Sequence, residues 1–186
     1  MAVKTMKKNI GTGQYTAGWH ELTISKATDG TWGEKRTIDL NFEGYPDNMS
    51  HRVFEASNKT TGEEFKIANL FRFACAGIIS VLQDPTGKNP VIQYDDEVTN
   101  LVGTRVNVFF VKEASTTDGK EYSRTFDLAP VAQETEHLTW TDDDVARLKK
   151  SVEKQYTKRT ATTTNGVGTV TLDTTTTTTN DADIPF

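Results

Sequence analysis

Residues 19–42 read WHELTISKATDGTWGEKRTIDLNF, and this stretch decides the fold class. Apolar residues alternate with polar ones in each half of it, which is the pattern of a half-buried strand. The apolar positions that fall on one strand face are Leu22, Ile24, Ile38, Leu40 and Phe42. The pair Asp29-Gly30 between the two halves is typical of a turn. The stretch therefore predicts two antiparallel strands in a mainly β protein.

Further elements are predicted on the C-terminal side of this hairpin. A third strand is expected at about 50–56, and apolar residues at helical spacing predict a helix over Glu63–Gln83. Two more strands, Gly103–Lys112 and Glu121–Leu128, flank the turn signal Asp118-Gly119. A last helix is expected to begin at Thr141, where Asp144 can complete a capping box. Its apolar stripe consists of Val145, Leu148, Val152 and Tyr156.

The order of these elements favours one small barrel. Three strands, a helix, two strands and a C-terminal helix form the order of the OB-fold, in which a five-stranded barrel carries one helix between strands three and four. Other small mixed sheets share this order and remain alternatives. A mainly β, five-stranded OB-fold barrel with a C-terminal helix is the predicted fold.

The composition divides the chain into three parts. Residues 1–159 are expected to form the folded domain, and residues 160–180 a flexible tether, because residues 160–179 include twelve threonines and few apolar side chains. Residues 181–186 form an acidic tip. The net charge is −5, but the tail holds three acids and no base, which leaves 21 basic against 23 acidic residues in residues 1–159. Any basic surface must therefore be local.

The cysteine content and the apolar stretches indicate the cellular compartment. Cys75 is the single cysteine, so an internal disulfide and a cysteine-based zinc site are excluded. Basic residues near the start of the chain are not followed by an apolar run, and the most apolar stretch, Ile67–Leu82, is too short to span a bilayer. A cytoplasmic protein with no membrane partner is expected.

The acidic tip reads Asp181-Ala182-Asp183-Ile184-Pro185-Phe186. It resembles the C-terminal tips of the single-stranded DNA-binding proteins of bacteria and many of their phages. The resemblance implies that Asp181, Asp183, Ile184, Pro185 and Phe186 recruit replication or recombination proteins such as a polymerase, helicase, primase or nuclease. Phe186 would fill an apolar pocket while its carboxylate meets a basic residue, and the aspartates would steer the approach.

Two segments of the folded domain carry a weaker resemblance. Residues 18–24 and 118–122 look like parts of phage-encoded OB-fold binding proteins. Residues 1–130 lack the pattern of the bacterial housekeeping protein, so its tetramer is not implied and a homodimer stays open. A phage-encoded protein that binds single-stranded DNA in a bacterial host is the expectation.

Basic residues interleave with aromatic ones on the predicted strands and turns. Single-stranded DNA needs this mixture, since cations contact phosphates and ring faces accept unstacked bases. The candidate DNA-binding residues are Trp32, Lys35, Arg36, Arg52, Phe54, Lys112, Lys120, Tyr122 and Arg124. Aromatic residues in strands more often build a core, and Trp19, Phe109, Phe110 and Phe126 are expected to pack inside.

No catalytic set emerges from the sequence. The acidic runs 95–97 and 142–144 could hold a divalent ion, but consecutive residues do not converge on one side of a helix, and the second run already suits a helix N-terminus. Neither an enzyme activity, a cofactor nor a metal site is expected. The alternatives are a structural or interaction module without DNA binding, and a metal-dependent nuclease.

Overall fold

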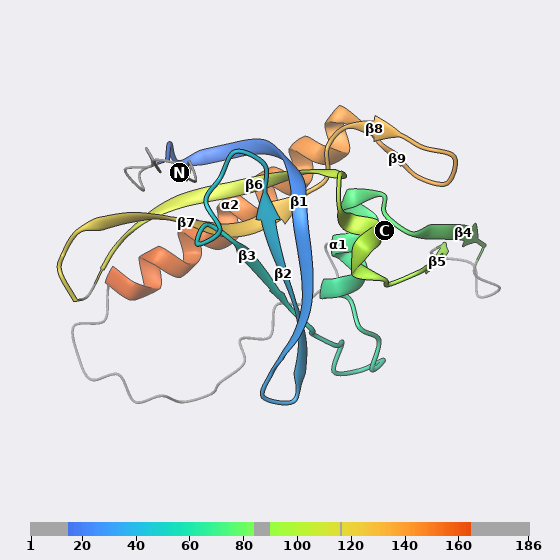
Figure 1. Cartoon of the computed structure of the whole chain (residues 1–186), viewed down its shortest axis with the longest axis horizontal. Helices are drawn as coiled ribbons and strands as arrows, with labels where there is room; N and C mark the ends of the chain where they lie inside the picture. The colour runs from blue at the N-terminus through green and yellow to red at the C-terminus, as the bar shows by residue number, and fades with distance from the viewer. Residues whose placement is uncertain (1–14, 84–89, 116, 165–186) are drawn as a thin grey trace, which may run out of the picture.

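A five-stranded antiparallel sheet forms the centre of the protein (Figure 1). The computed structural model describes residues 15–83, 90–115 and 117–164, with the backbone alone for 161–164. The strand order is β3-β2-β1-β6-β7. These strands are β1 (Gly18–Trp32), β2 (Lys35–Phe42), β3 (His51–Phe54), β6 (Arg105–Ala114) and β7 (Glu121–Ala129). The predicted β-rich fold is confirmed, and residues 19–42 form a hairpin. The predicted turn at Asp29-Gly30 is wrong, because these residues pair with Ile38 and Thr37 inside the ladder and the turn lies at Gly33-Glu34.

The long strand β1 pairs with a different strand in each half of its length. Residues 18–23 pair with β6, whereas residues 24–32 pair with β2. A bulge between Ile24 and Lys26 marks the change of partner, and bulges bend and twist a strand. The two hairpins that result, β1–β2 and β6–β7, project from different ends of the sheet (Figure 1).

The edge strands β3 and β7 approach each other without forming a ladder in the described part of the chain. The hydroxyl of Thr125 on β7 donates a hydrogen bond to the carbonyl of Ser50, just before β3, at 3.1 Å. The sheet is therefore strongly curved but not closed by backbone hydrogen bonds between its edges.

The core lies on the concave face of this sheet. The side chains there are apolar and almost fully buried, and the short helix α1 (Lys66–Ala74) adds its own apolar stripe. The core side chains include Ile24, Ile38, Leu40, Phe42, Val53, Ile67, Leu70, Phe71, Val106, Val108, Phe110 and Leu128. The alternation seen in residues 19–42 is thus the alternation between this core and the opposite face.

The predicted helix over Glu63–Gln83 is wrong in its second half. Helix α1 ends at Ala74, because Cys75 adopts a left-handed conformation with φ 49° and Gly77 follows with φ 62°. The chain then forms strand β4 (Ile78–Leu82), which pairs with β5 (Val91–Tyr94) as a separate hairpin. The apolar residues of this hairpin mimicked helical spacing in the sequence.

Helix α2 (Asp142–Thr164) covers the outside of β6 and β7. The predicted cap at its start is confirmed, since the Thr141 hydroxyl accepts from the Asp144 N–H at 3.2 Å and donates to its carboxylate at 2.7 Å. Val145 and Val152 are buried as the stripe predicted. The helix runs five residues past Arg159, and the rest of the expected tether and the tip lie outside the described residues.

Three short elements complete the described chain. They are the 3₁₀ helix η1 (Val98–Leu101) and the paired strands β8 (Gln133–Glu134) and β9 (Thr139–Trp140). Trp140 on β9 donates its indole N–H to the Arg72 carbonyl at 3.1 Å, which ties this hairpin to α1. None of the described helices is both long and apolar enough to cross a membrane.

Candidate nucleic-acid interface

The strand register gathers four of the candidate residues on one exposed surface. Trp32 lies opposite Lys35, Phe54 opposite Thr37, and Arg52 opposite Asp39. Residues two apart on a strand share a face, so these side chains all point away from the core. We call this surface the outer face; it consists of Lys26, Thr28, Gly30, Trp32, Lys35, Thr37, Asp39, Asn41, Arg52 and Phe54. Thr37 points to this side of the sheet but is itself buried.

Two large aromatic rings stand exposed on the outer face. Trp32 is 65% exposed and Phe54 is 40% exposed, although both are residues that folding normally buries. Their ring centroids lie 5.8 Å apart with the planes at 80°, an edge-to-face contact. The contact holds the two rings together and leaves ring surface open to a flat ligand such as a base.

The outer face carries more cations than anions. Lys26 and Lys35 are both exposed. Arg52 binds the Asp39 carboxylate through two hydrogen bonds of 2.6 and 2.8 Å, and this hydrogen bonding is the main reason that the pKa of Arg52 is raised. Three basic residues against one acidic residue give this surface a charge of about +2, within a chain whose net charge is −5.

Lys26 is a member of this surface that the sequence interpretation missed. It lies six residues before Trp32 on the same strand and therefore shares its face, with Thr28 and Gly30 between them. Counting back from Trp32 in steps of two would have found it. The bulge after Ile24 hides this relation, because it breaks the alternation that the apolar residues of β1 establish.

Arg36 lies on the opposite face from Lys35. Its guanidinium contacts the carboxylates of Asp29, at 3.0 Å, and of Asp96, and its backbone N–H donates to the Glu55 carboxylate. The hydrogen bond to Asp29 is the main reason that the pKa of Arg36 is raised, and the same contact lowers the pKa of Asp29. Arg36 therefore links the β1–β2 hairpin to the segment before η1.

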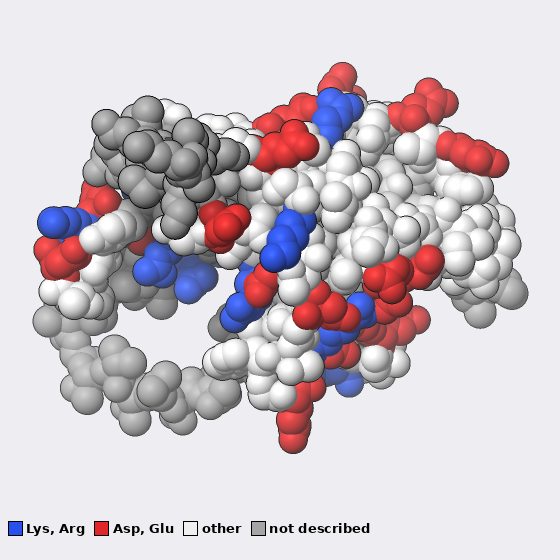
Figure 2. Space-filling view, in the orientation of Figure 1, with Lys and Arg blue, Asp and Glu red and all other residues white. Residues whose placement is uncertain are grey.

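The other four candidates lie on the β6–β7 hairpin, apart from the outer face (Figure 1). The Tyr122 hydroxyl donates to Asp118 at 2.6 Å, and Arg124 pairs with Glu113 at 3.5 Å. Lys112 and Lys120 are exposed at the same hairpin. Acidic residues match the basic ones here, and Figure 2 shows Lys and Arg in small groups among Asp and Glu in that view of the molecule.

The aromatic residues expected inside are indeed packed against other elements. Phe110 is fully buried in the core. Phe109 and Phe126 pack with Tyr156 of α2 at centroid distances of 5.9 and 5.1 Å. Trp19 donates its indole N–H to Glu153 of the same helix at 2.8 Å. Helix α2 thus covers the part of the sheet that the outer face does not occupy.

The acidic runs have local partners rather than a common centre. Asp95 accepts a hydrogen bond from the Glu97 N–H, Asp96 binds Arg36, and Asp144 caps α2. In residues 15–83, 90–115 and 117–164, no three His, Cys, Asp or Glu side chains are grouped as metal ligands.

The candidate partner-binding residues Asp181, Asp183, Ile184, Pro185 and Phe186 lie outside the described part of the chain. The chain matches no protein-family model, and a search of curated protein sequences finds no match.

Proposed function

We propose that this protein binds single-stranded DNA without sequence preference and coats and protects the strand in DNA replication, recombination or repair. The observation that carries the proposal is the outer face, where two exposed aromatic rings stand among three cations. Ring faces accept any base, and cations follow the phosphates, so such a surface binds a strand without reading its sequence.

The fold supports the same proposal. We propose that the curved five-stranded sheet is an OB-fold barrel that remains open between its edge strands. In OB-folds the face of strands two and three binds oligonucleotides. On this assignment the outer face lies at that position, because β2, β3 and the end of β1 form it.

Recruitment of other proteins rests on the sequence resemblance of residues 181–186 and is part of the proposal. So is a phage origin for the protein. Pro185 restrains the backbone before Phe186, which reduces the entropy lost when the tip docks into a partner.

A titration followed by tryptophan fluorescence tests the proposal. The full chain is titrated with oligo-dT and with a duplex of the same length, each with and without Mg²⁺, and the DNA is then run on a denaturing gel. We expect quenching by oligo-dT, weaker binding of the duplex, and intact DNA. Absence of binding would favour a structural module, and Mg²⁺-dependent cleavage would identify a nuclease.

A further inference from the structure

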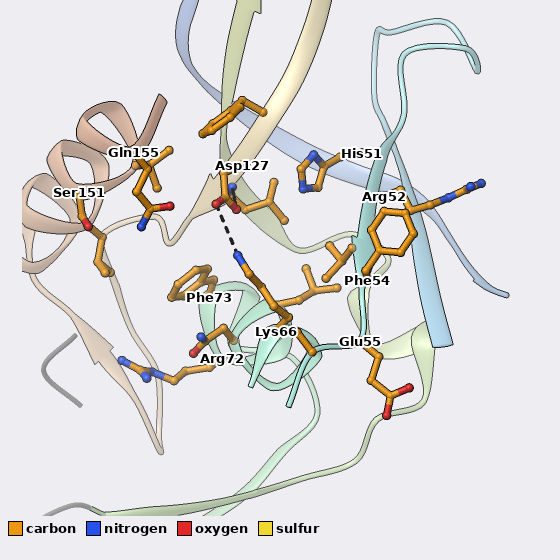
Figure 3. Close-up of a pocket in the computed structure, with 18 of the residues that line it drawn as sticks. His51, Arg52, Phe54, Glu55, Lys66, Arg72, Phe73, Asp127, Ser151 and Gln155 are labelled. Atoms are coloured by element: carbon orange, nitrogen blue, oxygen red, sulfur yellow. Dashed lines mark hydrogen bonds and ion pairs between the residues drawn. The ribbon is translucent and has the colours of Figure 1, made fainter. Parts of the chain in front are cut away.

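A groove of about 330 Å³ lies next to the outer face, between the edge strand β3 and helix α2 (Figure 3). Helix α1 and strand β7 form the rest of its wall. Lys35, Arg52 and Phe54 line the groove and also belong to the outer face. The groove is therefore continuous with the surface on which we place the DNA, and its volume is within the range of small-ligand sites, roughly 300–1,000 Å³.

The lining of the groove repeats the chemistry of the outer face. Phe73 of α1 and Phe126 of β7 supply aromatic surface, and the lining is mainly apolar between charged side chains. The basic lining residues are Lys35, Arg52, Lys66 and Arg72, and the acidic ones are Glu55 and Asp127. Lys66 reaches across to Asp127 at 3.6 Å (Figure 3). The excess of basic residues suits a polyanion.

Arg72 is a largely buried cation in this lining. Its guanidinium lies 4.8 Å from the centre of the Trp140 ring and forms no ion pair with any of the described residues. The side chain is largely buried, and this loss of water lowers its pKa. A partly dehydrated cation that forms no ion pair gains more from a phosphate than a fully hydrated one does.

We propose that the strand bound by Trp32 and Phe54 continues over the edge of β3 into this groove. There the phosphates contact Lys66 and Arg72, and one base packs against the rings of Phe73 and Phe126. This inference rests on the proposed function and extends it, because it gives the strand a direction of exit from the outer face and adds a second contact region.

A pair of substitutions on α2 tests the path of the strand. Ser151 lines the groove, whereas Ala146 is exposed on the same helix and does not line it. Ser151→Glu and Ala146→Glu change the net charge equally. Binding is measured at low salt with a short oligo-dT of about four nucleotides and a longer one of about 16, the range of OB-fold site sizes.

The two α2 variants should differ in their affinity for the longer oligo-dT. Ser151→Glu should weaken binding of the longer oligo-dT roughly five- to tenfold, through repulsion of phosphates in the groove, and leave the short one nearly unchanged. Ala146→Glu should leave both nearly unchanged. Thermal unfolding of each variant checks that α2 remains folded.

Variants of Arg72 give a second readout. Arg72→Met keeps an unbranched chain against Trp140 but removes the charge. For the longer oligo-dT, the slope of log affinity against log salt should fall by about 0.7, the contribution of one phosphate contact. Arg72→Lys should restore most of that slope, which loss of packing alone would not do.

The outcomes separate this inference from the proposed function. If the unaltered protein binds oligo-dT while Ser151→Glu and Arg72→Met bind the longer strand as it does, the groove path is wrong and the proposed function stands. Tighter binding by Ser151→Glu would also overturn it and would assign the groove to an acidic peptide segment. A protein that binds no oligo-dT would remove both proposals.

Discussion

Lys35 and Arg36 show how much a single residue depends on strand register. The two are adjacent, both are basic, and both were candidates for DNA binding. Consecutive residues of a strand point to opposite faces, and the structure puts Lys35 beside Trp32 and Arg36 between Asp29 and Asp96. The alternation in residues 36–42 was sufficient to predict this separation, since Arg36 has the parity of Ile38 and Leu40.

Substitution of these two residues should give opposite results. Lys35→Gln should lower the slope of log affinity for oligo-dT against log salt by about 0.7 and leave stability unchanged. Arg36→Gln should leave that slope unchanged and lower the free energy of unfolding by about 1 kcal/mol, because the exposed carboxylates of Asp29 and Asp96 lose their charged donor. Salt titrations and urea unfolding of both variants measure this, and a flattened slope for Arg36→Gln alone would contradict the assignment of faces.

His51 gives the protein a predicted sensitivity to acid. It is buried on β3, and burial is the main reason that its pKa falls from 6.5 to about 4, although Asp127 and Asp39 oppose the shift and Lys66 adds to it. Between these values the unfolded chain binds the proton and the folded one does not, so stability rises with pH. The contribution is complete above pH 6.5 and is lost as the pH falls towards 4.

At pH 5 this effect should lower the free energy of unfolding by up to about 2 kcal/mol, because each unit of difference in pKa corresponds to about 1.36 kcal/mol. Carboxylates also titrate in this range, so the comparison is between the unaltered protein and His51→Gln, by urea unfolding at pH 7.5 and at pH 5. The variant should lose less stability than the unaltered protein between these values. Equal losses would show that His51 titrates normally in the folded state.

At the scale of elements, local pattern predicted the strands better than the first helix. Alternation predicted the strands of both hairpins, β1–β2 and β6–β7, and the Thr141 cap predicted the start of α2. The turn signal was correct at Asp118-Gly119 but wrong at Asp29-Gly30, which lies inside β1. The uncharged apolar residues of Ile78–Leu82 fit either a helix or a strand, and only the backbone at Cys75 and Gly77 decides between them. Gly77 was the available signal, because glycine within a helical pattern weakens that interpretation.

The Gly77→Ala substitution distinguishes the two structures by the sign of its effect. In a helix the change would stabilise the protein by roughly 1 kcal/mol. In the observed turn, Gly77 has φ 62° and an added Cβ would overlap the carbonyl oxygen of Asp95. We therefore expect a loss of about 1–3 kcal/mol in urea unfolding.

Gly62→Ala is the matched control for this change. Gly62 also has a positive φ, 76°, but no atom lies within 4 Å of the added Cβ. It should lose less stability than Gly77→Ala, because only backbone strain contributes. A gain of stability from Gly77→Ala would contradict the observed turn and favour the longer helix predicted from the sequence.

The start of α1 depends on a contact that the helical pattern did not reveal. The Glu64 carboxylate accepts hydrogen bonds from the backbone N–H groups of Ile67 and Ala68 at 2.7 and 2.9 Å. The predicted helix already contained Glu64, so the residue was assigned to the helix rather than to its cap. Local periodicity locates a helix but places its ends poorly.

At the scale of the whole molecule, α2 determines which part of the sheet stays open. It packs over Trp19, Phe109 and Phe126 and leaves the outer face uncovered. Periodicity could not predict this division, because it depends on contacts between residues more than a hundred positions apart, such as Trp19 with Glu153. For the same reason, the nine candidate residues divide into four on the outer face, one on its reverse and four on another hairpin.

The most direct test of the central claim compares the two hairpins in one oligo-dT titration. Trp32→Ala and Phe54→Ala should each weaken binding by about 1–3 kcal/mol while the fold remains intact, as expected for loss of a stacked base. Tyr122→Ala, which removes an exposed aromatic residue from the β6–β7 hairpin, should leave the affinity nearly unchanged. Full affinity in the Trp32 and Phe54 variants, with a loss in the Tyr122 variant, would contradict the assignment of the DNA site to the outer face.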